Sequence, residues 1–184
     1  VNAGAYLRRL DGLLFGDNVS EGVVRDNEVL HPDLDFRIAF PKSWTVENTP
    51  TAIAAMSPNQ DGVAAFGLAG RGEAADLPAI ADEFAARLEK DYGTRPELRD
   101  GATAAGLPAQ AVIVTDRSGP EPVHLYFLWV ADRGRIFQMI GIAPHAQVAM
   151  VRAIVETLRP LTATERASIA ELRLRVVAAR PGES

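Results

Sequence analysis

Hydrophobic and polar positions alternate along residues 36–40, where FRIAF places two phenylalanines and an isoleucine on one side of an extended chain. This period of two predicts a strand with one buried face. Pro32 and Pro41 flank the run, and because proline donates no hydrogen bond to a neighbouring strand, they mark its ends. Trp44 and Val46 resume the alternation. We therefore predict an edge strand whose aromatic side chains enter the core, followed by an indole that caps the core.

Alternation, or a short apolar run between turn formers, predicts further strands at residues 23–25, 28–30, 52–56, 63–68, 110–115, 123–131 and 135–142. The connections among the last three strands are short, so neighbouring strands must be antiparallel. The middle one, VHLYFLWVA, is apolar on both faces and is expected in the interior of the sheet. The segment GATAAGLPA, residues 101–109, is predicted as a turn.

A different period, of three to four residues, predicts a long helix with apolar residues at Leu77, Ile80, Phe84, Leu88 and Tyr92. Asp76 is its expected N-cap, and Gly93 is expected to end it. A second helix is predicted over residues 146–158, before Pro160.

The two ends of the chain carry weaker signals. A short helix is predicted within residues 3–22, in which several glycines interrupt a leucine pattern. Thr162 and Glu165 have the spacing of a capping box, so a helix should run from there to about Leu172. Alternation at residues 173–176 then predicts one last strand.

The order strands, helix, three-strand meander, helix is typical of an α+β fold, with a mainly antiparallel sheet flanked by helices. The predicted core contains Phe36, Ile38, Phe40, Trp44, Leu77, Ile80, Phe84, Leu88, Ile113, Leu125, Phe127, Trp129, Ile140, Ile154 and Leu158.

Composition narrows the possible functions. The chain has 184 residues, a net charge of -5 and a pI of about 5.2, so the molecule as a whole has no electrostatic attraction to nucleic acid or anionic lipid. Its apolar runs are far shorter than the roughly 20 residues that span a bilayer. The absence of cysteine excludes disulfides, thiolate zinc sites and cysteine nucleophiles. Because the chain begins at Val1 and stops at PGES, we expect a piece of a longer protein.

The acidic cluster before the first aromatic strand is the first candidate for chemistry. His31, Asp33 and Asp35 could offer nitrogen and oxygen atoms to a hard cation, but calcium loops carry more oxygen ligands and a glycine turn. We interpret the cluster as a polar turn. The three histidines do not have the i, i+4 spacing of an H-E-x-x-H zinc helix.

The other candidates are weaker. His124 lies in a strand without an acid or nucleophile placed beside it in the sequence, so a partly buried structural role is favoured over a general base. The sequence around Ser57, Ser118 and Ser168 lacks the G-x-S-x-G context of a serine hydrolase. The glycine-rich GLAGRG, residues 67–72, matches no phosphate-binding loop. We predict no catalytic, cofactor-binding or metal-binding residue in this chain.

One family resemblance adds to this reading. The segment YLRRLDGLLFGDNVSEGVVRDNEVLHPDLDFRIAFPKSW, continued by TPTAIAAMSP to residue 58, resembles the region after the catalytic domain of bacterial HtpX-like zinc metalloproteases, of the CAAX prenyl protease type. The H-E-x-x-H motif and the distal glutamate of that family are absent from this chain, so none of the family's catalytic residues can be transferred. The resemblance implies zinc only in a parent protease domain, and a periplasmic or otherwise extracytoplasmic location.

Two further likenesses concern the fold. The FP-x-x-W motif within this order of elements resembles PsbP-like domains, which are α/β/α sandwiches that usually bind partners. The final PGES resembles the opening of a LysM-like module. Together these give a predicted division into residues 1–27, a linker with a short helix; 28–160, a PsbP-like domain; and 161–184, a helix-strand tail.

The leading hypothesis is therefore a non-catalytic accessory domain that binds a protein partner or the parent's own protease domain, without nucleic acid and without membrane insertion. The alternative is an independent small-ligand-binding or enzymatic domain with a pocket between the sheet and a helix. An internal cavity with converging polar groups would favour the alternative, whereas a solid core with an exposed patch would favour the accessory domain.

Overall fold

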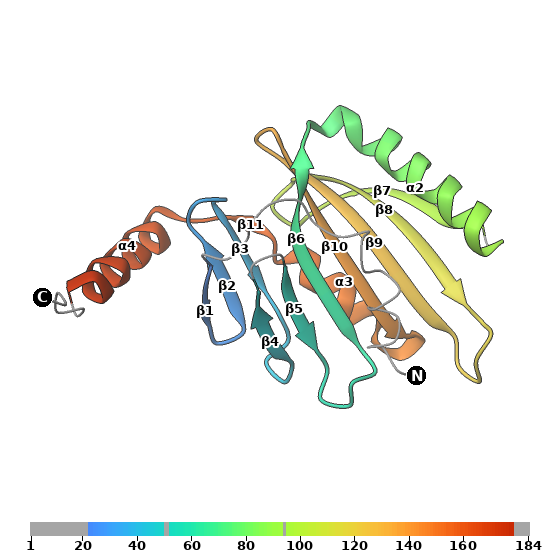
Figure 1. The fold of residues 1–184 in the computed structure, drawn as a ribbon, viewed down its shortest axis with the longest axis horizontal. Helices are drawn as coiled ribbons and strands as arrows, with labels where there is room; N and C mark the ends of the chain where they lie inside the picture. Colours follow the sequence, from blue (N-terminus) through green and yellow to red (C-terminus); the bar gives the residue numbers. More distant parts are fainter. Residues whose placement is uncertain (1–21, 50–51, 94, 179–184) are drawn as a thin grey trace, which may run out of the picture.

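A computed structural model describes residues 22–49, 52–93 and 95–178 of the chain. A large antiparallel sheet of seven strands forms the body (Figure 1). Across the sheet the strands follow the order β4 (Thr45–Asn48), β5 (Ile53–Met56), β6 (Val63–Arg71), β10 (Arg135–Pro144), β9 (Val123–Asp132), β8 (Pro108–Asp116) and β7 (Glu97–Ala102). A small antiparallel sheet contains β1 (Val23–Arg25), β2 (Glu28–His31), β3 (Phe36–Ala39) and β11 (Arg159–Pro160).

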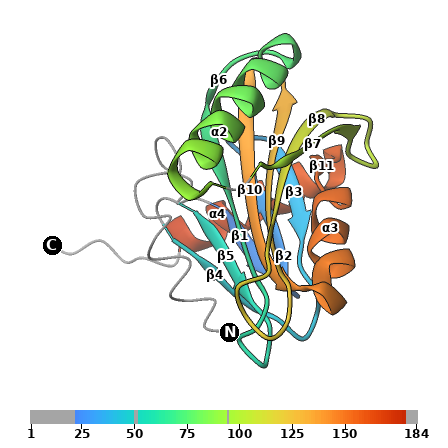
Figure 2. The same ribbon diagram turned by 90° about the vertical axis from the view of Figure 1, so that its right-hand side faces the viewer.

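Helices cover both faces of the large sheet (Figure 2). On one face lies α2 (Leu77–Tyr92), preceded by the 3₁₀ turn η1 (Ala74–Asp76). On the other face lie the small sheet and α3 (Val148–Glu156), preceded by the 3₁₀ turn η2 (His145–Gln147). A third helix, α4 (Ala163–Ala178), lies to the side of these layers beyond β1 and β2 (Figure 1). The architecture is the predicted α+β arrangement with helices on both faces of the large sheet, with the small sheet as an addition.

Two apolar clusters occupy the two faces of the large sheet. The α2-side cluster joins α2 to β8, β9 and β10 and includes Phe84, Phe127 and Trp129. The α3-side cluster joins α3, the small sheet and the same large sheet, and includes Phe36 and Trp44. All predicted core residues are buried except Ile80, Ile113 and Leu125, which keep intermediate exposure. A fully buried side chain of this kind contributes about 1.5 to 3 kcal/mol.

Most sequence-predicted elements are confirmed, including the antiparallel meander β8–β9–β10 and both helices on the large sheet. Gly93 ends α2 with φ at +67°. Asp76 occupies the predicted N-cap position of α2, but its carboxylate makes no capping hydrogen bond to that helix and instead accepts one from the Glu73 amide at 2.7 Å. The strand β3 is not an edge strand, since it pairs with both β2 and β11.

Two other predictions fail for physical reasons. Residues 97–102, part of which was predicted as a turn, form the edge strand β7, and every one of them is exposed. An exposed edge strand has no buried face, so it leaves no alternation in the sequence. Residues 173–176 are helical rather than a strand, because α4 continues to Ala178. Four alternating residues do not outweigh a capped segment rich in alanine, glutamate, leucine and arginine, which are good helix formers.

The chain's two ends bear on the predicted division into domains. The helix predicted within residues 3–22 falls, except for its last residue, outside the described residues. The predicted boundary at residue 28 separates β1 from β2, although the two strands pair in one sheet. They are joined by a tight turn in which Asp26 and Asn27 have positive φ angles of 47° and 63°, the geometry that twisted hairpins favour.

Candidate functional site

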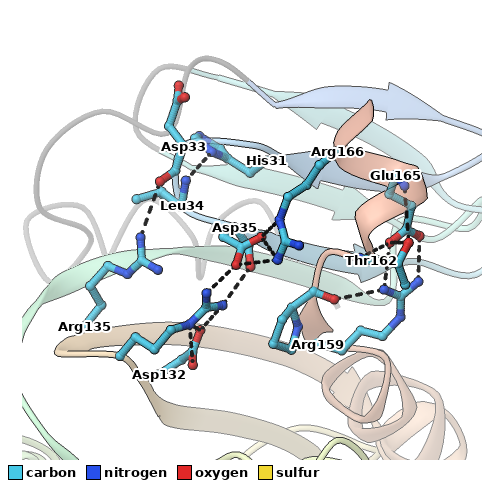
Figure 3. Close-up of polar contacts among 12 residues, drawn as sticks. His31, Asp33, Leu34, Asp35, Asp132, Arg135, Arg159, Thr162, Glu165 and Arg166 are labelled. Carbon is cyan, nitrogen blue, oxygen red and sulfur yellow. Dashed lines mark hydrogen bonds and ion pairs between the residues drawn. The ribbon is translucent and has the colours of Figure 1, made fainter. Parts of the chain in front are cut away.

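A polar cluster joins the two sheets to α4, and Asp35 is its centre (Figure 3). Asp35 lies in the turn between β2 and β3, with a left-handed φ of +53°. Its carboxylate accepts a hydrogen bond from Arg133, in the β9–β10 turn. It also accepts two from Arg166 of α4, from Nε at 2.8 Å and from Nη2 at 2.9 Å. One carboxylate thus ties together three segments that are distant in sequence.

The positive and negative side chains of this cluster compensate one another. Burial opposes ionisation of Asp35, but the hydrogen bonds and charges of Arg133 and Arg166 outweigh it and hold the pKa of Asp35 below its usual value. Arg133 also donates to Asp132, and the two carboxylates raise the pKa of the Arg133 guanidinium. Because these charges compensate each other, the cluster is suited to holding segments together.

A second ion pair fixes the start of α4. Arg159 of β11 donates to both carboxylate oxygens of Glu165, at 2.8 and 2.7 Å. The same carboxylate accepts the Thr162 amide at 2.8 Å, while the Thr162 hydroxyl accepts the Glu165 amide at 3.2 Å. This is the predicted capping box. The Arg159 hydrogen bonds, with burial opposing them and Thr162 assisting, lower the pKa of Glu165 to about 2.

The other two members of the predicted polar turn have different neighbours. His31 is buried, its ring stacks on Phe36 with centroids 5.3 Å apart, and its Nδ1 accepts the Leu34 amide at 3.1 Å. The Asp33 carbonyl lies 3.5 Å from an Arg135 nitrogen. Across the described ranges, no group of three or more histidine, cysteine, aspartate or glutamate side chains is placed to hold a metal ion. That this turn binds no metal ion stays a prediction.

The histidine prediction missed one contact. His124 of β9 and His145 of η2 lie 21 positions apart in sequence, but His124 Nε2 is 3.0 Å from His145 Nδ1. His124 Nδ1 lies 3.1 Å from the Thr115 hydroxyl. Sequence spacing could not reveal the pair, because it depends on β9 and β10 being neighbours in register, with Ala143 opposite His124. His124 is half-buried and His145 is exposed.

Ser57 and the glycine-rich GLAGRG segment, which the sequence analysis considered as candidate sites, have local structural roles. The Ser57 hydroxyl donates to Asp61 at 2.6 Å and accepts the Gly62 amide at 2.8 Å, which shapes the β5–β6 turn. Hydrogen bonds from Ser57 and Gln147 lower the pKa of Asp61. The GLAGRG segment forms the end of β6 and the residue that follows it.

A hollow of about 230 Å³ lies between α4 and the β1–β2 hairpin. Its lining combines apolar and polar side chains: Val23, Arg25, Leu30, Thr164, Glu165, Ser168 and Ile169. Beneath it, Leu30, Leu161 and Ile169 are buried as a small cluster, here called the α4 cluster. None of the described helices is long and apolar enough to cross a bilayer.

Comparisons with known proteins give weak structural likenesses. No family model matches the chain, and neither does any curated protein. Among solved structures, it is similar to a protein from Bacteroides thetaiotaomicron VPI-5482, with a TM-score of 0.48 and 13% identity over 77% of this chain and 51% of that one. The chain therefore spans about half the length of the Bacteroides protein.

Two other structures are similar at the same level. The cyanobacterial PsbP (CyanoP) from Synechocystis sp. PCC 6803 has a TM-score of 0.48 and 10% identity, over 69% of this chain and 87% of that one. LpqN, involved in cell envelope biogenesis of Mycobacterium tuberculosis, has a TM-score of 0.43 and 17% identity, over 68% and 83%. Among the described residues, two antiparallel sheets and three α-helices confirm the predicted α+β fold class. Likenesses this weak carry no argument about function, and they do not support a protease parent or a LysM-like end.

Proposed function

We propose that this chain is a non-catalytic accessory domain that binds a protein partner through α4 and the adjoining face of β1 and β2. The observation that carries the proposal is how α4 is attached. Ion pairs of Glu165 and Arg166 and the small α4 cluster hold its first turns, while the helix extends away from both sheets (Figure 1). A helix held at one end against a hollow has a surface available for a second protein.

The size and lining of the hollow favour a protein partner over a small ligand. Its volume of about 230 Å³ is below the roughly 300–1,000 Å³ of typical ligand pockets. It is open to solvent, and Arg25 and Glu165 place opposite charges in its lining. The alternative of a small-ligand or enzymatic domain would use this same hollow, since it lies between a sheet and a helix. A single side chain that projects from the surface of a protein partner fits the volume of this hollow better than a typical small ligand does.

The finer proposal is that the partner is the protease domain of a parent zinc metalloprotease, located in the periplasm or elsewhere outside the cytoplasm. Its support is the resemblance of residues 6–58 to the region that follows the catalytic domain of HtpX-like enzymes. Zinc would then belong to the parent's catalytic domain.

The first experiment is to read the coding sequence upstream of Val1. An H-E-x-x-H helix there supports the protease parent, and its absence removes that finer proposal. The upstream domain is then expressed separately and titrated calorimetrically with this chain. Thr164→Arg fills the hollow from an exposed position of α4, and Ala167→Arg, exposed on the same helix but outside the hollow, is the matched control.

We expect Thr164→Arg to weaken binding about tenfold or more, as steric loss at a central contact does, and Ala167→Arg to leave it nearly unchanged. If wild type and Thr164→Arg bind the partner equally well, the interface does not include the hollow beside α4. Tight, saturable binding of a small metabolite in the hollow, lost in Thr164→Arg, would favour the alternative function.

A further inference from the structure

The His124–His145 pair lies at the start of α3 and is independent of the α4 surface. Along β9, Tyr126 and Leu128 belong to the α3 side of the large sheet, whereas Val123 and Phe127 belong to the α2 side. Because side chains alternate along a strand, His124 faces the same side as Tyr126. Its ring centroid is 5.1 Å from that of His145, with the planes tilted by 43°.

The contact between the two rings requires an unprotonated nitrogen. A neutral imidazole carries one N–H donor and one acceptor nitrogen, whereas the protonated ring carries two donors. His124 Nε2 and His145 Nδ1, 3.0 Å apart, can therefore share a hydrogen bond when at least one ring is neutral. When both rings are protonated, two N–H groups and two positive charges face each other. The hydrogen bond is then replaced by repulsion.

The surroundings make the second proton unfavourable. Burial, the charge of His145 and the charge of Arg117 in the β8–β9 connection all lower the pKa of His124. From β8, Thr115 offers a neutral hydroxyl. Further along the same face, Arg152 and Glu156 of α3 and Arg99 of β7 act on Tyr126. Among these neighbours, the only carboxylate is that of Glu156, and it lies beside Tyr126 in company with two arginines.

The far part of α3 is anchored by other contacts. The Thr157 hydroxyl accepts the Ala39 amide at 2.8 Å and lies 2.6 Å from the Ile154 carbonyl. Val151 packs so closely over Gly141 that a Cβ atom at residue 141 would lie 2.1 Å from the Val151 Cγ1 atom. By contrast, η2 has no side-chain cap, and none of its residues is buried. Besides the histidine contact, a hydrogen bond from Gln147 to Asp61 of the β5–β6 turn holds η2. Loss of the histidine contact therefore weakens, but does not abolish, the attachment of residues 145–150.

We infer that the His124–His145 hydrogen bond is a proton-sensitive contact that helps to hold η2 and the first turn of α3 on the large sheet near neutral pH and that loosens them in mild acid. The loosened segment is bounded by β10 on one side and by the Val151–Gly141 contact on the other. Histidine is the side chain whose ordinary pKa suits such a switch. The opening exposes the α3-facing end of β9 without unfolding the domain.

Amide hydrogen exchange of the full chain tests the inference. Exchange rates, corrected for the intrinsic effect of pH, are compared at about pH 7.5 and pH 5. We expect the protection of residues 145–150 to fall about threefold or more at the lower pH, as a local opening predicts, while that of residues 151–157 stays constant. His145→Gln can still form a hydrogen bond but cannot titrate in this range, so it should abolish the difference. Met150→Gln, an exposed α3 position, should retain it.

Ring-proton titration by NMR gives an independent readout. In wild type, His124 should titrate below its ordinary range, and His145→Gln should shift the His124 titration upward by removing one neighbouring charge. The inference is overturned if the amide protection of residues 145–150 in wild type does not depend on pH, or if His145→Gln shows the same pH dependence as wild type. It is also overturned if the pKa of His124 is the same in wild type and His145→Gln.

Discussion

The large sheet and helix α4 belong to one chain, but they are held in opposite ways. The sheet is packed on both faces, with aromatic rings such as Phe66 and Phe137 stacked 5.5 Å apart in its interior. Within residues 163–170, the part of α4 whose side chains are described, Ile169 is the one buried residue; it belongs to a cluster of three buried residues, and two ion pairs add to the attachment. Salt screens partly exposed ion pairs but does not screen apolar contacts. The comparison predicts a body that unfolds cooperatively and an α4 that opens first.

The largest expected effect tests the body. Trp44 is 3% exposed and belongs to the α3-side cluster, so Trp44→Ala should lower the free energy of unfolding by about 3 to 5 kcal/mol. Chemical denaturation measures it. A loss under about 1 kcal/mol would contradict the placement of the indole in the core.

A smaller loss of stability, confined to α4, is expected when the apolar contact beneath this helix is removed. Ile169→Ala removes most of the apolar contact under α4 and should lower the free energy of local α4 opening by about 2 kcal/mol, the low end for such truncations, because the cluster is small. Hydrogen exchange of the α4 amides measures this change. The denaturation midpoint of the body should hardly move, and a large shift there would mean that α4 and the sheet unfold as one unit.

Asp35→Asn separates the ionic part of the attachment from the apolar part. It keeps the size of the side chain but removes the charge that Arg133 and Arg166 share, and both arginines are about half exposed. We expect a loss of about 1 kcal/mol in α4 protection, reduced by solvent screening. High salt should weaken α4 protection in wild type and have less effect in the variant. Equal salt sensitivity would show that other charges hold the helix.

Acid should act on α4 before it acts on the apolar body. The pKa of Glu165 is about 2 in the folded chain against an ordinary 4.5, so its stabilisation is present above the ordinary value and is lost as the pH falls from about 4.5 towards 2. Glu165→Gln can keep the capping hydrogen bonds without the charge. Circular dichroism and α4 exchange should show a weaker acid dependence in that variant.

The smallest expected effect is that of a chelator. If the polar turn with His31, Asp33 and Asp35 has only a structural role, removal of metal ions should leave the melting temperature unchanged, since a bound stabilising metal would raise it. A drop of several degrees with chelator, or peptidase activity that survives repurification, would contradict the non-catalytic reading.

The sequence predicts best those strands and helices that have one buried face. Strands and helices with a buried face, such as β3 and α2, repeat apolar residues with a recognisable period. The exposed edge strand β7 leaves no such period, and the alternation of four residues near the end of α4 predicts a strand that the structure does not contain.

The candidate sites were less predictable, because their members come from distant segments. Asp35 was singled out, but its partners Arg133 and Arg166 lie 98 and 131 positions away. His124 and His145 meet only because one lies on β9 and the other directly follows the neighbouring strand β10. Contacts of this kind depend on strand register and on where a helix crosses a sheet, which single-sequence periodicity does not encode.

The close approach of α3 to β10 at Gly141 also has a mechanical consequence. Val151 sits in a notch that only glycine can form, since a Cβ atom there would lie 2.1 Å from its Cγ1 atom. A helix seated in this way cannot slide along the strand without lifting its side chains over the neighbouring ones. We therefore expect a disturbance at the His145 end to move the first turn of α3 about this contact, and we expect little of that motion to reach the small sheet.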